Sequence, residues 1–108
     1  DPAGKWLTED IGGGGVAGDL QTTLEIADGR ASGKGGCNRY NAAIRIEGDT
    51  MSVGPAMSTR MACAAAAMAQ EQKFFNALGK VAKWKLENTR LILMDSGGSE
   101  ILKFRAIE

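Results

Sequence analysis

Short turn-forming pairs recur along this 108-residue chain, and each lies between segments in which polar and apolar residues alternate. The clearest is Asp28-Gly29, which separates residues 22–26 from residues 30–33. Asp-Gly suits a type I′ turn because both residues tolerate positive φ, so the pattern predicts an antiparallel hairpin. The other predicted strands are residues 5–9, 43–47, 51–53, 83–87, 90–94 and 100–105.

The number of strands limits how the sheet is arranged. About eight strands joined mostly by short turns are too many for one flat open sheet in a chain of 108 residues. A small, antiparallel, barrel-like sheet is therefore predicted. The length leaves room for a single core, so residues 1–108 are interpreted as one mainly β (α+β) domain.

One segment departs from the alternating pattern. Residues 62–78 are rich in alanine and contain neither glycine nor proline, and Gly79 follows them, so one helix is predicted here. Its apolar stripe is suited to packing against the sheet or across the mouth of a barrel. Glu71 points toward the same side and needs a partner when buried. Arg39 and Arg60 are the expected partners.

The chain contains no histidine, which restricts its chemistry. This absence removes the usual general base of serine and cysteine hydrolases, histidine-containing zinc sites and imidazole pH switches. With 13 basic and 13 acidic residues, the long-range attraction that drives nucleic-acid binding is missing. We predict no catalytic residues, no cofactor and no nucleic-acid partner, and no apolar run approaches the length of a membrane-spanning helix.

Cys37 and Cys63 are the only cysteines, 26 positions apart. Two thiols cannot form a zinc site without further ligands, and a nucleophilic cysteine lacks its usual base here. Two interpretations remain open, a disulfide or two buried thiols. Met57, Met61 and Met68 lie near Cys63 and suggest a site for monovalent copper, but methionines beside a helix usually fill core gaps, so no metal site is predicted.

Two glycine-rich stretches resemble phosphate-binding motifs. Residues 13–18 fit the pattern G-x-G-x-x-G, but the chain continues into a β-branched strand without room for the helix that would face a phosphate. Gly33-Lys34-Gly35-Gly36 continues into Cys37 where a P-loop would continue to Gly-Lys-Ser/Thr. We interpret the first stretch as a mobile loop and the second as a bend or bulge in the sheet.

Two motifs carry a resemblance to a known family. Gly36-Cys37-Asn38-Arg39-Tyr40 and Ser58-Thr59-Arg60-Met61-Ala62-Cys63 are similar to motifs of the META domain family, which includes HslJ-like heat-inducible envelope proteins. Supporting positions extend over nearly the whole chain. The chain departs from the family pattern at residues 64–67, where members often carry a proline soon after the cysteine.

The resemblance implies a small antiparallel barrel with one helix packed against it. It also implies the periplasm or, for a lipoprotein, the outer membrane, and a start at Asp1 suggests that a targeting segment or lipid anchor was removed. An oxidising compartment favours a disulfide between Cys37 and Cys63. If this bridge forms, it draws Arg39 and Arg60 toward Glu71 and forms a structural charge network between helix and barrel.

No activity comes with the resemblance, because the molecular function of the family is not established. We expect a non-enzymatic, monomeric envelope domain, associated with heat or other stress, that has a structural role or binds another envelope protein or a small apolar ligand. The alternative is an inhibitor or chaperone-like module that holds a protein or a lipid, as pilotin-type barrels do.

Overall fold

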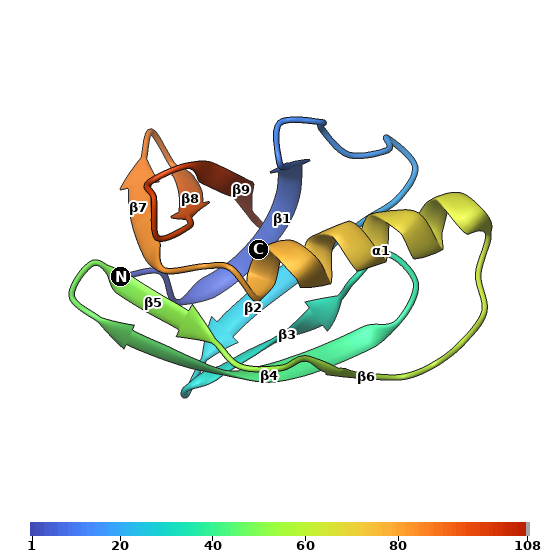
Figure 1. The fold of residues 1–108 in the computed structure, drawn as a ribbon, viewed down its shortest axis with the longest axis horizontal. Helices are drawn as coiled ribbons and strands as arrows, with labels where there is room; N and C mark the ends of the chain where they lie inside the picture. The colour runs from blue at the N-terminus through green and yellow to red at the C-terminus, as the bar shows by residue number, and fades with distance from the viewer. Residues whose placement is uncertain (108) are drawn as a thin grey trace.

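The computed structural model describes residues 1–107 as a β-sheet with one helix packed against it (Figure 1). The helix and strands follow one another in the order β1 (Gly4–Ile11), β2 (Thr23–Ala27), β3 (Arg30–Lys34), β4 (Arg39–Glu47), β5 (Thr50–Val53), β6 (Met57–Ser58), α1 (Ala65–Leu78), β7 (Lys83–Glu87), β8 (Arg90–Met94) and β9 (Glu100–Ile107). All strand pairings in this part of the chain are antiparallel.

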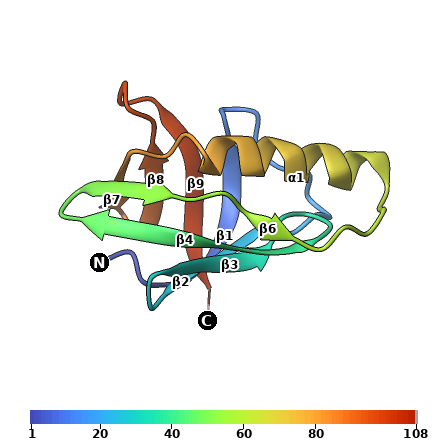
Figure 2. The same cartoon turned by 60° about the horizontal axis from the view of Figure 1, so that its bottom comes forward.

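Eight of the strands form a closed ring. Neighbours pair in the order β3, β2, β1, β9, β8, β7, β5 and β4, and a pairing of β3 with β4 closes the ring. β6 adds two residues beside β4, beyond the end of β5. Figure 2 shows the ring from a second side. The predicted barrel-like sheet is confirmed, and β6 is a further short strand that the sequence pattern did not indicate.

The turn residues explain why the chain reverses direction where it does. Asp28 and Gly29 have φ values of 53° and 74°, as a type I′ turn requires. Asn88 and Thr89, between β7 and β8, have φ values of 49° and 67°. The hairpins predicted at these two places are confirmed by the pairing of the flanking strands.

Large apolar side chains fill the inside of the ring. Phe74 of α1 is fully buried, and its ring centroid lies 5.5 Å from that of Tyr40 and 6.5 Å from that of Phe104. Eight strands enclose a space that side chains alone can fill. The strands contribute Trp6, Leu24, Ile26, Met51, Leu91, Leu93 and Leu102 to the same core. The interior is therefore a packed core.

The helix lies across one end of the ring, beside β1 (Figures 1 and 2). It begins at Ala65, so the predicted start at residue 62 is wrong. Ala64 has φ −57° and ψ 151°, the non-helical conformation of an N-cap residue, and it follows directly on the disulfide-bonded Cys63. The helix ends at Leu78, and the Gly79 amide donates a hydrogen bond to the Phe75 oxygen at 3.1 Å.

Tyr40 makes the stability of this core dependent on pH. Its side chain is buried, and its hydroxyl donates a hydrogen bond to the Thr23 backbone oxygen at 2.6 Å. Burial raises the pKa of the phenol well above its ordinary value of 10.0, because the ionised form would lose its hydration. The folded chain keeps this proton at pH values where the unfolded chain loses it. Its contribution to stability is thus complete below about pH 10 and falls as the pH rises further.

Replacing Tyr40 with phenylalanine should separate the contribution of the hydroxyl's hydrogen bond from that of the raised phenol pKa. At pH 8 we expect a loss of about 1 kcal/mol from the missing hydrogen bond. At pH 11 the wild type should have lost about 1.4 kcal/mol that the variant keeps, because one pH unit above the unfolded pKa corresponds to that free energy. Tyr40 is the only tyrosine, so the difference between the two proteins in guanidinium unfolding reports this residue. Parallel pH profiles would contradict the prediction.

Candidate functional site

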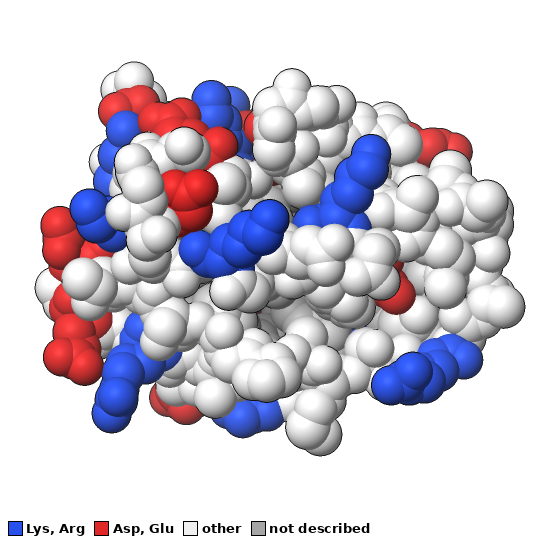
Figure 3. Space-filling model, in the orientation of Figure 1, with Lys and Arg blue, Asp and Glu red and all other residues white. Residues whose placement is uncertain are grey.

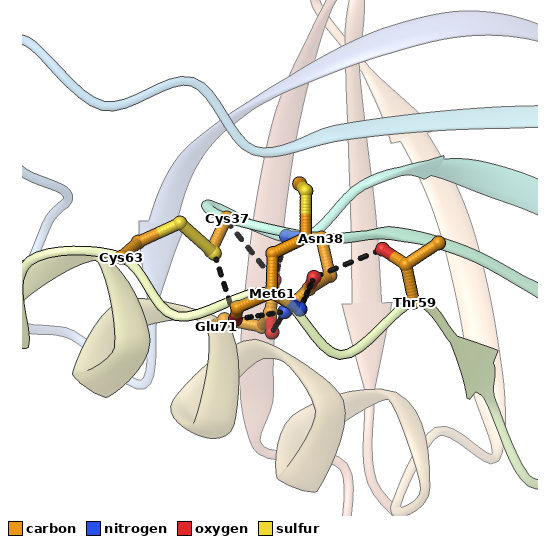
Figure 4. Close-up of a disulfide and its surroundings, with 6 residues drawn as sticks. All are labelled: Cys37, Asn38, Thr59, Met61, Cys63 and Glu71. Carbon is orange, nitrogen blue, oxygen red and sulfur yellow. Dashed lines mark hydrogen bonds between the residues drawn. A yellow bond between two sulfur atoms is a disulfide. The ribbon is translucent and has the colours of Figure 1, made fainter.

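A disulfide connects the barrel to the segment that leads into the helix. It joins Cys37, in the connection between β3 and β4, to Cys63, just before α1, with their Cα atoms 6.0 Å apart (Figure 4). Cys37 is buried and Cys63 is exposed. Of the two interpretations that the sequence left open, the structure therefore has the disulfide.

Glu71 lies beside the bridge, on the face of α1 that is turned toward the barrel. It is 6% exposed, and its Oε1 accepts hydrogen bonds from the backbone amides of Cys37 at 3.0 Å and Asn38 at 2.5 Å. Its Oε2 accepts a third, from Nδ2 of Asn38 at 2.9 Å. Hydrogen bonds to a carboxylate are stronger than those between neutral groups, so this contact ties the helix firmly to the β3–β4 connection.

Asn38 joins three segments through one buried amide. While Nδ2 faces Glu71, Oδ1 accepts hydrogen bonds from the Thr59 hydroxyl at 2.9 Å and from the Met61 amide at 2.7 Å. Nδ2 also approaches the Met61 oxygen at 3.4 Å. We call Cys37, Asn38, Thr59, Met61, Cys63 and Glu71 the disulfide cluster (Figure 4). Every polar atom of the Asn38 side chain is used within it.

The arginines that the sequence proposed as partners of Glu71 lie elsewhere. The side chains of Arg39 and Arg60 are exposed, and Glu71 takes part in no ion pair within the described residues. The physical reason is that the Glu71 carboxylate already accepts hydrogen bonds from two backbone amides and from the side-chain amide of Asn38. These groups are already fixed by the fold, whereas an arginine would lose side-chain freedom to reach it. Sequence reasoning identified the buried carboxylate and missed Asn38.

Two glycines explain why the helix comes so close. A Cβ on Gly35 would lie 2.9 Å from Cγ of Glu71 and 3.0 Å from Cε1 of Phe75. A Cβ on Gly36, whose φ is +132°, would lie 3.1 Å from the Ala67 oxygen. The second glycine stretch is thus the place where the barrel touches α1, and the phosphate-loop pattern there has a packing explanation.

The first glycine stretch is closed off by its own hydrogen bonds. The carboxylate of Asp10 accepts bonds from the amides of Gly13 at 2.8 Å and Gly15 at 2.6 Å, and Gln70 accepts one from Ala17 at 2.9 Å. A carboxylate therefore occupies two of the backbone amides that a phosphate would need, and β2, not a helix, follows.

The arrangement of the disulfide cluster suits it for holding segments together. Both sulfur atoms are consumed by the bridge, and both oxygens of Glu71 accept hydrogen bonds in a buried position. Across residues 1–107, no three side chains of the metal-ligating types come together. What the cluster fixes is the path of residues 59–63, which run between β6 and α1.

The model of the META domain family matches residues 2–108. The chain belongs to the META domain family. Both motifs that carried the resemblance contribute to the disulfide cluster, which gives them a physical role in this META domain. None of the curated proteins matches the chain.

Solved structures share the fold. A protein from Burkholderia xenovorans, solved by NMR, is 24% identical with a TM-score of 0.79 over 96% of this chain and 81% of its own. A second NMR structure is 19% identical, with a TM-score of 0.73 over 95% of this chain and 88% of its own. The crystal structure of a DUF4847 family protein from Bacteroides vulgatus is 15% identical, with a TM-score of 0.67 over 95% and 92%. At these identities the likeness concerns the fold alone.

Three exposed methionines lie on or beside the disulfide cluster of the META domain. Met57 is 69% exposed, Met61 56% and Met68 40%. Figure 3 shows that the face over α1 and β6 carries few charged side chains, whereas charges gather toward β5 and β7 to β9. In the described part of the chain, no helix combines the length and apolar character needed to cross a membrane.

Proposed function

We propose that this META domain is a non-enzymatic, protein-binding domain of the bacterial envelope that acts under stress such as heat. The observation that carries the proposal is a rigid backbone that presents exposed methionines. We call residues 57–63 the methionine segment. It binds the partner, and the disulfide cluster keeps it in a binding-competent conformation.

Exposed methionines favour a binding role over a purely structural one. A methionine side chain in water gains nothing for the fold, and flexible, polarisable methionines are common on surfaces that adapt to protein partners. Met57 and Met61 are the two most exposed large apolar side chains of the described residues. Both lie in the same seven-residue segment.

The rigidity of this segment strengthens the proposal. Met61 is bonded to Asn38 through both its backbone amide and its backbone oxygen, and the Thr59 amide donates to the Arg39 oxygen at 3.0 Å. Cys63 anchors the far end covalently. A segment that is ordered before binding loses less entropy when a partner arrives, so the same contacts give a higher affinity.

The packed interior disfavours a small apolar ligand held inside the barrel. A shallow apolar depression of about 310 Å³ lies between α1 and the β5–β6 connection, lined by Val53, Pro55, Ala56, Phe75 and Leu78. It supports the alternative function, a module that holds a lipid chain.

The envelope assignment rests on the disulfide, since such bonds persist in oxidising compartments.

Photo-crosslinking through the methionines tests the proposal. Producing cells are fed photo-methionine and irradiated during heat stress, and adducts of the domain are identified by mass spectrometry. We expect a protein adduct attached at Met57 or Met61 that disappears in the double variant M57Q/M61Q. Met51, which is 2% exposed, is the internal control and should give no adduct with another protein. An adduct that persists in the double variant, or a lipid as the adduct, would contradict the proposal.

A further inference from the structure

We infer that the outer face of β1 to β4 recognises an acidic, extended segment of the protein partner. The inference rests on the proposed function and specifies the chemistry of that partner. The face contains four exposed basic residues that take part in no ion pair within residues 1–107, namely Lys5, Arg30, Lys34 and Arg39. Arg30 donates a hydrogen bond to the side-chain oxygen of Asn41, which leaves Lys5, Lys34 and Arg39 for a ligand. Figure 2 brings β3 and β4 of this face toward the viewer.

Two of these basic residues are held side by side by strand register. Lys34 of β3 lies directly opposite Arg39 of β4, so both side chains project from the same face. Like charges in this position repel each other and destabilise the sheet. The pair is therefore a cost to the fold unless an anion lies between them.

A second like-charge pair in the same sheet shows how the fold itself neutralises such a contact. Arg90 of β8 lies opposite Arg105 of β9, and Glu9 is placed between them, 2.6 Å from Arg90 and 3.9 Å from Arg105. No carboxylate of the described residues does the same for Lys34 and Arg39. Glu9 neutralises the Arg90–Arg105 pair, and we infer that a carboxylate of the partner does the same for the Lys34–Arg39 pair.

The shape of the surface favours an elongated ligand. Lys5, Lys34 and Arg39 line a depression of about 210 Å³ together with the hydroxyl-bearing Thr23 and Ser32. A second depression of about 520 Å³ adjoins it, and Ser32 and Arg39 line both. The other residues that line the second depression are Tyr40, Asn41, Met57, Ser58 and Thr59.

The two depressions differ in chemistry, so each is suited to a different group of the ligand. The first offers cations and hydroxyl groups that suit a carboxylate, and the second offers the exposed thioether of Met57 to an apolar side chain. A polypeptide with acidic residues next to an apolar one fits both. Glu25 also lines the first depression and opposes a continuous anionic surface such as a membrane, whereas a single carboxylate seated between Lys34 and Arg39 avoids it.

The probe that tests this inference is the blocked peptide Glu-Glu-Leu-Glu-Glu-Leu, with its Gln-Gln-Leu-Gln-Gln-Leu counterpart as the uncharged reference. Binding is measured by calorimetry and by amide NMR shifts of the intact chain at low and physiological salt. We expect saturable binding of the acidic peptide alone, shifts centred on β3 and β4, and weakening by salt. The substitutions Arg39→Gln and Lys34→Gln should each weaken binding at least about fivefold, the net effect of losing one ordinary hydrogen bond.

Arg45→Gln is the matched control. Arg45 lies on the same face of β4 and is likewise exposed, but it is already paired with Glu47 at 3.6 Å. Its loss should leave peptide affinity within about twofold. Absence of saturable binding, no effect of Arg39→Gln, or an equal effect of Arg45→Gln would each overturn the inference. Arg39-dependent binding to phosphatidylglycerol vesicles without peptide binding would overturn it in favour of a lipid surface.

The two proposals fail in different ways. Crosslinks at Met57 or Met61 whose yield is unchanged by Arg39→Gln would leave the binding function standing and remove only the acidic specificity. Loss of those crosslinks in Arg39→Gln, with retention in Arg45→Gln, would support both.

Discussion

Replacing Glu71 with glutamine is expected to lower the free energy of unfolding by about 2–4 kcal/mol, since it removes charge-assisted hydrogen bonds and leaves a buried donor without an acceptor. Glutamine keeps one oxygen for the amides of Cys37 and Asn38 but turns its own NH₂ group toward Nδ2 of Asn38. Rotating the Asn38 amide does not help, because its NH₂ group would then face the Met61 amide and the Thr59 hydroxyl would lose its acceptor.

Urea unfolding at pH 7 measures this loss, and the melting temperature should fall by at least about 10 °C. Glu47→Gln is the control, because Glu47 is an exposed glutamate in a surface ion pair and should change stability by less than about 0.5 kcal/mol. Equal stability of the Glu71 variant and the wild type would show that the cluster does not hold the helix. If such a variant also lost its partner, the carboxylate would belong to the binding surface instead.

Removing the disulfide should have an effect of the same order. The bridge spans 26 positions, and closing a loop of this length restricts the unfolded chain by about 3.5 kcal/mol. Total stabilities of domains are about 5–15 kcal/mol, so the double variant C37S/C63S should be only marginally stable at elevated temperature. Dithiothreitol should destabilise the wild type to the same extent.

The serine double variant provides the control for this measurement, because its unfolding midpoint should not respond to dithiothreitol. Combining it with Glu71→Gln should cost less than the two separate losses added together. Both changes loosen the β3–β4 connection at Cys37, and neighbouring perturbations are not independent. A wild-type midpoint that dithiothreitol leaves unchanged would contradict the role of the bridge.

Local signals in the sequence were sufficient for most of the fold. Turn pairs such as Asp28-Gly29 and Asn88-Thr89 determine where strands reverse, and their conformation depends on the residues themselves. The alternation of polar and apolar residues determines which face is buried. Together with the strand count, these signals predicted the barrel and its single helix correctly.

The sequence could not reveal contacts between distant segments. β6 pairs with β4 through two residues, too few to leave a period in the sequence. The start of α1 was wrong by three residues because alanine propensity carries no information about the disulfide at Cys63, which lies within the predicted first turn.

The candidate site was predicted only in part, for a related reason. A carboxylate on the apolar side of a helix is a visible signal, and Glu71 was identified from it. Its partners are backbone amides and Asn38, 33 and 34 positions away in the chain, and backbone amides carry no sequence signature. Arg39 and Arg60 were chosen for their charge, whereas the fold supplied neutral donors that were already in place.

Native-state hydrogen exchange at the amides of Cys37, Asn38 and Met61 tests most directly whether the cluster fixes the methionine segment. These three amides donate to side chains, not to a β-ladder, so nothing except the cluster protects them. We predict that in the oxidised wild type they exchange as slowly as the amides that bond β8 to β9, and that Glu71→Gln speeds up all three. Exchange in the folded wild type at the rates of freely exposed amides would contradict the account.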